Sequence, residues 1–277
     1  MTLHRTAAGR AIAGALLLGW GAASAATPPA YVLGVIPSLP PLATHQRWNP
    51  VALRLAHRAR VPIRLKLYDD MARFEADLLA GKLDLVFSHP LMAIEGHRRQ
   101  GYEPLVRDRR RISVTVFTRK DAAIRSMSDL DGKRIAVVGD QHYCTELLER
   151  MFSRSGLQAT VERKHAGSSL NTVRTVLMHR AEAGAILDVA FEEIPGDVRM
   201  LLRPVLSSRE TASHPLSAHP RVRTEVRARI AAAFLDMAAD ALDRRLLDAV
   251  GMPEPERADY DRDYRSIEPP PFARSRR

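Results

Sequence analysis

The sequence predicts an α/β fold of two similar lobes, each a mainly parallel sheet flanked by helices, and two observations lead to this prediction. The stretch 78–87 (LLAGKLDLVF) recurs in outline at 176–187 (VLMHRAEAGAIL), and each copy combines a helix end, a basic turn, an acidic residue and a short apolar strand. Upstream of each copy, strand-like and helix-like segments alternate, which is typical of parallel sheets. A chain with two similar halves commonly carries its function between them.

The first half predicts strands, loops and helices in alternation. A helix is expected from Asn49 as N-cap, with Pro50 at its first position and Trp48 packed in the core, and Asp70 is expected to cap the next helix. The remaining segments are strands at 31–36, 62–68 and 83–87, with a Pro-rich loop at 37–41.

The second half repeats this plan. Asp84 and Glu182 occupy matching places in the two copies, so both are expected to cap the turns that enter the last strands. The other segments are strands at 134–138, 159–164 and 183–187, loops at 139–143 and 167–169, and helices from about Cys144 and Leu170.

Two apolar stretches between the halves, 112–118 and 200–206, are expected to be the segments that cross between the lobes. The sequence therefore predicts one lobe from 26–111 and 207–277 and the other from 112–206. Helices are expected from Thr224 and over 241–250, and the end of the chain, with its prolines at 269–271, is expected to be extended or disordered.

The first 25 residues predict a secretory signal peptide. Arg5 and Arg10 precede an apolar run at 11–20 and a small-residue stretch at 22–25, so cleavage is expected after Ala25. No later segment approaches the roughly 20 apolar residues of a transmembrane helix. We therefore expect a protein that is exported to the periplasm, is not embedded in the membrane and is monomeric.

Composition narrows the classes of partner. The single cysteine, Cys144, excludes an internal disulfide, so the core that the 45% hydrophobic composition can build must supply the stability. The net charge is +10 and loses two units with Arg5 and Arg10, which favours anionic ligands, anionic membrane surfaces or nucleic acid. Export argues against nucleic acid.

Several motifs carry a family resemblance in their order and spacing: GVIP (34–37), RWNP (47–50), GKLDLVF (81–87) before PL (90–91), GYEP (101–104), SDLDGKRIA (128–136) and GS (167–168). Over 31–240 the chain resembles the solute-binding proteins of phosphate, phosphite and phosphonate ABC transporters, which have the type II periplasmic-binding fold. The resemblance implies two lobes that close on a phosphonate- or phosphate-like oxyanion, with no cofactor and with a membrane permease as partner.

The resemblance also locates the ligand site. Loops after parallel strands and the starts of helices are where such sheets bind ligands, because helix starts offer unpaired N–H groups to anions. Phosphonate-binding relatives commonly open one of these helices with a Ser-Thr-Ser-Gly type sequence, where this chain has QHYCT at 141–145. Thr145 and the Tyr143 phenol are the hydroxyl donors left there.

Nine residues are candidate ligand contacts, since they follow strands or open helices at the expected cleft. Asp188 can accept a hydrogen bond from an amine or a protonated oxyanion, or it can cap the following turn. The serines at 168 and 169 can cap their helix, contact ligand, or do both. The candidates are Ser38, His89, His142, Tyr143, Cys144, Thr145, Ser168, Ser169 and Asp188.

Histidines near these loops leave a second kind of site open. With Cys144, whose thiol pKa a helix start would lower, they would suit a soft metal or a thiolate-reactive oxyanion such as arsenite. The other interpretation is independent histidines and a small buried thiol. No Cys-X-X-Cys or His-X-X-X-His spacing is present, so we expect no metal.

The leading hypothesis is therefore a periplasmic solute-binding protein for an ABC importer, and not an enzyme. Three alternatives stay open at this point. They are a ligand sensor that partners a membrane histidine kinase, an exported enzyme with Cys144 as nucleophile and His142, His89 or His165 as base, and an accessory protein that has lost its ligand.

Overall fold

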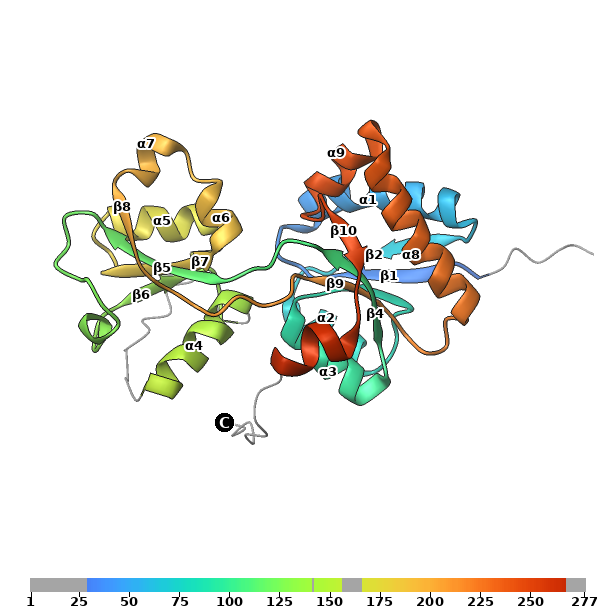
Figure 1. The fold of residues 1–277 in the computed structure, drawn as a ribbon, viewed down its shortest axis with the longest axis horizontal. Helices are drawn as coiled ribbons and strands as arrows, with labels where there is room; N and C mark the ends of the chain where they lie inside the picture. The colour runs from blue at the N-terminus through green and yellow to red at the C-terminus, as the bar shows by residue number, and fades with distance from the viewer. Residues whose placement is uncertain (1–28, 141, 156–165, 268–277) are drawn as a thin grey trace, which may run out of the picture.

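The computed structural model describes residues 29–140, 142–155 and 166–267, and these form two lobes, each on its own β-sheet (Figure 1). The expected signal peptide, the strand expected at 159–164 and the prolines at 269–271 lie outside the described residues. The first sheet has the order β10-β4-β9-β3-β1-β2 and the second β6-β7-β5-β8. The strands are β1 (Tyr31–Val35), β2 (Ile63–Lys66), β3 (Leu85–Phe87), β4 (Glu103–Asp108), β5 (Val114–Arg119), β6 (Ile135–Val137), β7 (Ala183–Leu187), β8 (Leu202–Ser207), β9 (Pro215–Ala218) and β10 (Pro255–Arg257).

Helices cover both faces of the first sheet, with α1, α8 and α9 on one side and α2 and α3 on the other, while α4 to α7 belong to the second lobe (Figure 1). The helices are α1 (Pro41–Ala59), α2 (Met71–Leu79), α3 (Pro90–Gln100), α4 (Tyr143–Ser155), α5 (Ser169–Leu177), α6 (Asp188–Glu192), α7 (Gly196–Arg199), α8 (Thr224–Ala239) and α9 (Ala241–Ala249). Short helical turns follow at η1 (Ser128–Leu130), η2 (Tyr260–Tyr264) and η3 (Arg265–Ile267).

Both sheets are mixed rather than mainly parallel. Strands β2, β1 and β3 are parallel, as are β6 and β7, which matches the predicted alternation of strand and helix. Strands β9, β4 and β10 join the first sheet antiparallel, and β5 and β8 do so in the second. In the first sheet, β9 is the first strand after the chain returns from the other lobe. It runs opposite to its neighbour β3.

The two copies of the sequence repeat have matching turn conformations and matching hydrogen bonds in the structure. Gly81 and His179, at matching positions, both adopt left-handed backbone conformations, with φ of 66° and 59°. Asp84 then accepts a hydrogen bond from the Val32 N–H at 2.8 Å. Glu182 accepts one from the Arg134 N–H at 2.9 Å. Each acidic residue therefore ties the turn to the start of the neighbouring parallel strand.

Helix α1 begins earlier than the sequence predicts. The expectation that Asn49 caps it is wrong, because Pro41 takes the first helical turn and Pro50 lies inside the helix. A proline costs nothing at a helix start, where its missing N–H has no partner, but it removes a hydrogen bond in the interior. The buried stripe that includes Trp48, which is 5% exposed, anchors the helix through Pro50. The predicted cap Asp70 is confirmed, since its carboxylate accepts from the Arg73 N–H at 2.7 Å.

The connections between the lobes overlap the stretches expected to cross only at residues 112 and 113. Most of 112–118 and 200–206 forms β5 and β8, which pair with each other in the second sheet. The chain passes between the sheets at 109–113 and 208–214, and a bridge pairs Ile112 with Thr211 there. The apolar residues in these two stretches therefore belong mostly to strands of the second sheet, and the chain crosses between the lobes beside them.

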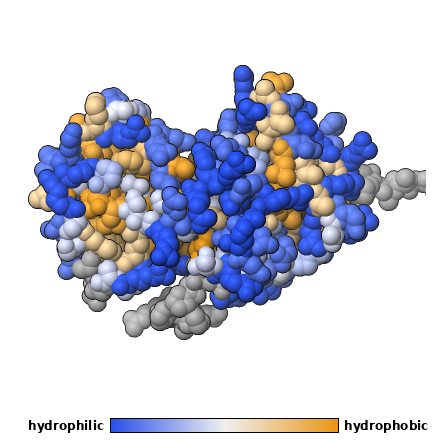
Figure 2. All heavy atoms as spheres, in the orientation of Figure 1, coloured by the Kyte–Doolittle hydropathy of each residue, from blue (hydrophilic) through white to orange (hydrophobic). Residues whose placement is uncertain are grey.

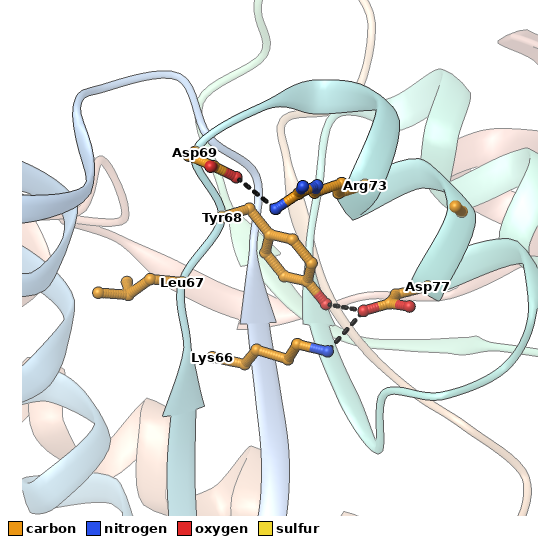
Figure 3. Close-up of a pocket in the computed structure, with 7 residues that line it drawn as sticks. Lys66, Leu67, Tyr68, Asp69, Arg73 and Asp77 are labelled. Carbon is orange, nitrogen blue, oxygen red and sulfur yellow. Dashed lines mark hydrogen bonds and ion pairs between the residues drawn. The ribbon is translucent and has the colours of Figure 1, made fainter.

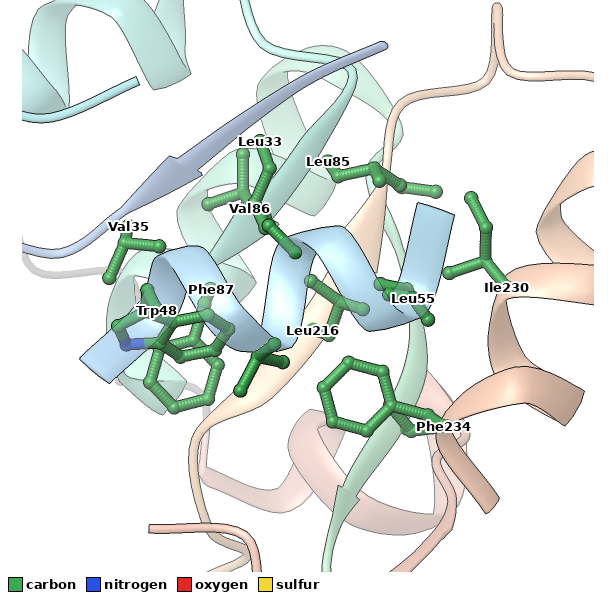
Figure 4. Close-up of a cluster of buried hydrophobic side chains, with 14 of the residues drawn as sticks. Leu33, Val35, Trp48, Leu55, Leu85, Val86, Phe87, Leu216, Ile230 and Phe234 are labelled. Carbon is green, nitrogen blue, oxygen red and sulfur yellow. The ribbon is translucent and has the colours of Figure 1, made fainter. Parts of the chain in front are cut away.

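The largest core fills the first lobe between its sheet and α1 and α8 (Figure 4). Its members include Leu33, Val35, Trp48, Leu55, Leu85, Val86, Phe87, Leu216, Ile230 and Phe234. A second apolar cluster joins the lobes, because it combines Leu91 and Ile94 of α3 with the interior of α4 and with Tyr260 and Tyr264 near the C-terminal end. The lobes are thus in packed contact beside the crossing segments.

The face shown in Figure 2 is mostly hydrophilic with apolar patches on both lobes, and a notch separates the two lobes along the upper edge of this view. Within the described residues, no helix combines the length and hydrophobicity needed to span a bilayer.

Candidate functional site

The first lobe offers the loops that follow β1 and β3, where parallel strands end. Ser38 lies exposed in the loop after β1, and its backbone N–H donates to the Ile36 carbonyl at 2.9 Å. His89 follows β3 and is buried, at 1% exposed. Its Nδ1 accepts a hydrogen bond from the Met92 N–H at 3.2 Å, so the imidazole caps α3. Pro90 takes the next position, where a proline fits a helix start.

The second lobe contributes the start of α4. His142 precedes the helix, and its Nδ1 accepts from the Cys144 N–H at 3.3 Å. The Thr145 hydroxyl is fully buried and donates to the Gly139 carbonyl at 2.6 Å. Thr145 therefore closes the turn before the helix, and its hydroxyl is engaged within the second lobe.

Cys144 is packed in an apolar core. Its side chain is 0% exposed and belongs to the apolar cluster that joins the lobes. Burial raises the pKa of its thiol far above the ordinary value, and the nearby Asp188 charge acts in the same direction. The expectation that the helix start lowers this pKa is wrong, because desolvation outweighs the helix dipole here. The thiol stays protonated at neutral pH.

Three rings from three separate segments meet between the lobes, and we call His89, Tyr143 and His214 the junction cluster. The His89 ring stacks on the Tyr143 ring with centroids 5.4 Å apart and planes 22° apart. His214, on the crossing segment, lies edge-on to both, with centroid distances of 6.4 Å to His89 and 6.0 Å to Tyr143. The Tyr143 hydroxyl is 2.7 Å from the Thr211 hydroxyl, so α4 is held to the crossing segment.

The junction carries neutral imidazoles. Burial, with a smaller contribution from the nearby His142, lowers the pKa of His214 to about 3. Burial also lowers the pKa of His142 to about 4. His89 has a pKa well below its ordinary value, chiefly because it is buried and also because it lies near His214, His142 and Arg150. At neutral pH these side chains offer hydrogen-bonding groups without charge.

Asp188 and the two candidate serines lie elsewhere in the second lobe. The Asp188 carboxylate accepts from the Ser113 hydroxyl at 3.0 Å and from the Val189 N–H at 2.9 Å, so it links β7 to the crossing segment. Ser168 caps α5 by accepting from the Asn171 N–H at 3.2 Å, and Ser169 is partly buried at the first position of that helix. None of the described contacts joins this helix start to the junction cluster.

Sequence reasoning missed two parts of the junction. Thr211 carried no recognisable motif, and its role depends on a hydrogen bond to Tyr143, 68 residues away along the chain. His214 is one of ten histidines in the chain, and no motif in the sequence distinguishes it. The sequence feature that could have identified His214 is its position directly before the strand β9, near the expected crossing between the lobes.

A separate cavity of about 320 Å³ lies in the first lobe between the end of β2 and α2 (Figure 3). Its acidic centre is Asp77, which accepts from Lys66 at 2.5 Å and from the Tyr68 hydroxyl at 2.9 Å and also pairs with Lys82 at 3.0 Å. The Lys66 and Lys82 ammonium groups hold the pKa of Asp77 far below its ordinary range. The Asp77 carboxylate is therefore already paired within the protein.

No group of three or more His, Cys, Asp or Glu side chains in the described part of the chain has an arrangement that could hold a metal ion.

A family model decides the class of protein. The model for periplasmic substrate-binding proteins of phosphonate ABC transporters matches residues 33–264. The chain belongs to this family. It is thus a periplasmic substrate-binding component of an ABC transporter, and membership of the family also implies its location in the periplasm. No curated protein matches the chain in sequence.

Solved structures show the same two-lobed fold for this substrate-binding protein. XAC2383 from Xanthomonas citri bound to ATP superposes with a TM-score of 0.73 at 19% identity, over 86% of this chain and 95% of that one. PhnD1 from Prochlorococcus marinus in complex with methylphosphonate gives 0.72 at 14% identity over the same shares. The VFT2 domain of Bordetella pertussis BvgS gives 0.52 at 16% identity, over 81% of this chain and 93% of that one.

Proposed function

We propose that this substrate-binding protein captures a small oxyanion, phosphonate- or phosphate-like, between its lobes. The observation that supports this most directly is the meeting of two helix starts from different lobes, since the His89 ring at the start of α3 stacks on Tyr143 at the start of α4. Helix starts carry unpaired N–H groups and a partial positive charge, which attract anions without a lysine or arginine. The similar fold of a protein that binds methylphosphonate supports the same ligand chemistry.

The proposed mechanism is closure of two lobes on the ligand. The lobes are proposed as 26–111 with 207–277, and 112–206. A ligand that contacts both lobes has a higher affinity for the closed form and so shifts the hinge equilibrium toward it. The ligand contacts remain the predicted set: Ser38, His89, His142, Tyr143, Cys144, Thr145, Ser168, Ser169 and Asp188.

The proposed partner is the permease of an ABC importer, which would receive the closed form. We propose that the mature protein begins at Ala26 and acts as a monomer. The burial of Cys144 argues against the alternative of an exported enzyme that uses this thiol, because a nucleophile must reach its substrate and ionise readily.

The test is thermal unfolding of residues 26–277 with methylphosphonate, inorganic phosphate, phosphite, sulfate and ATP, each as a concentration series. A ligand at 100 times its dissociation constant adds about 2.7 kcal/mol to the free energy of unfolding, so a true ligand raises the melting temperature and the rise grows with concentration. Glycine at the same ionic strength serves as the control. A flat response to all the oxyanions would contradict the proposed function.

A further inference from the structure

The imidazole of His89 has one nitrogen engaged and one unpaired. Its Nδ1 accepts the Met92 N–H at the start of α3. Its Nε2 is buried and has no hydrogen-bond partner among the described residues. Because 1% of the side chain is exposed, bulk solvent does not satisfy this nitrogen.

The cap determines which nitrogen carries the hydrogen. A neutral imidazole has one N–H and one lone-pair nitrogen, and a nitrogen that accepts a backbone N–H must be the one with the lone pair. The hydrogen of His89 is therefore on Nε2. Burial, together with His214, His142 and Arg150 nearby, lowers the pKa of His89 and keeps this ring neutral. The junction thus presents a neutral N–H donor that lacks an acceptor.

Two candidate hydroxyls at this contact are already used, while the buried Ser88 hydroxyl next to His89 also has no partner among the described residues. The Tyr143 hydroxyl pairs with Thr211, and the Thr145 hydroxyl donates to Gly139. Among the candidates with buried side chains, His89 has a free donor at the contact between the lobes.

We propose that His89 is the specificity-determining residue of the ligand site, and that its Nε2–H donates to an acceptor oxygen of the bound oxyanion. This rests on the proposed function and adds the recognition chemistry. The required ligand group is an oxygen of a phosphonate, phosphate or similar oxyanion beside the positive end of α3, and a cationic or donor-only group is rejected there. Selection follows from a hydrogen bond to a neutral group and not from pairing with a charged side chain.

The first measurement compares binding to the wild type and to His89→Asn by calorimetry, with methylphosphonate and inorganic phosphate as probes. Asparagine keeps an oxygen that can cap α3, because it is among the preferred N-cap residues, but it lacks the Nε2–H. We expect at least a tenfold loss of affinity with a melting temperature within a few degrees of the wild type. The matched control is His57→Asn on the exposed face of α1, which should bind as the wild type does.

The second measurement is nitrogen-15 NMR of the histidine rings in the wild-type protein, which does not depend on how well a variant folds. We expect the neutral Nε2–H form for His89 at pH 7 and a shift of its Nε2 resonance when methylphosphonate binds. An Nδ1–H form would overturn the assignment.

The outcomes also separate the two proposals. Wild-type binding with unchanged affinity in His89→Asn would overturn the role of His89 alone. Absence of wild-type binding to both probes would overturn the proposed function and this assignment with it.

Discussion

Acidification should destabilise this protein through its buried histidines before the carboxylates contribute. His142 has a pKa of about 4 and His214 of about 3 in the folded protein, against an ordinary value of 6.5. Because the unfolded chain binds protons more readily between these values, stability is full above pH 6.5 and falls as the pH drops toward the folded pKa. At pH 5.0 the loss is 1.5 pH units at about 1.36 kcal/mol each, or about 2 kcal/mol for each histidine.

The assay is urea unfolding at pH 7.5 and 5.0 for the wild type and for His214→Gln. His214→Gln should lose about 2 kcal/mol less than the wild type, because it lacks the contribution of His214 and keeps those of His142 and His89. Carboxylates with depressed pKa values, such as Glu182 at about 2, lose their contribution below about pH 4.5 and so lie outside this window. His57→Gln, an exposed histidine of α1, is the control and should behave as the wild type. An equal loss in the wild type and His214→Gln would refute the reasoning.

Three further changes test the packing by urea unfolding at neutral pH. Asp263→Asn weakens a buried partner of Arg107, 3.1 Å away, and should cost about 3 kcal/mol; a cost under 0.5 kcal/mol would contradict a buried ion pair there. Gly184→Ala places a Cβ 2.6 Å from a phenylalanine ring and should cost about 2 kcal/mol, whereas Gly139→Ala meets no atom within 4 Å and should be nearly neutral; equal costs would refute this. Leu55→Ala in the main core should cost about 3 kcal/mol, and a cost under 1 kcal/mol would contradict its tight packing.

Local patterns predicted the frame of the fold well. The echo of 78–87 at 176–187 identified the repeat, because a helix end and a left-handed turn are set by neighbouring residues. The acidic residue of each copy bonds to the start of a strand far away along the chain, and only its matching place in the two copies pointed to that role. The start of α1 could not be read in the same way. Asn49-Pro50 is a good local start signal, but tertiary packing of the stripe around Trp48 carries the helix through it.

The C-terminal segment shows a different limit. The sequence after Gly251 contains no periodic pattern, yet β10 adds an edge strand to the first sheet and the Tyr264 hydroxyl donates to the Ser213 carbonyl at 3.0 Å. The Arg107 guanidinium, which pairs with Asp263 and Glu256, fixes this segment from within β4. Charge pairs that join residues this far apart leave no local signature.

The candidate site contains features that the local sequence predicts and features that depend on contacts between distant residues. Position after a strand located His89, and position at a helix start located Tyr143, since each follows from the order of elements alone. The stacking of the two rings depends on how the lobes meet at the crossing segment. The same holds for the hydrogen bond between the hydroxyls of Tyr143 and Thr211. Sequence reasoning placed His89, Tyr143 and Thr145 together among the candidates but could not rank them, whereas the structure shows that the two hydroxyls have partners within the protein and that the His89 Nε2 has none among the described residues. A side chain's residue type predicts what it can donate, but only its neighbours determine whether that donor is still available.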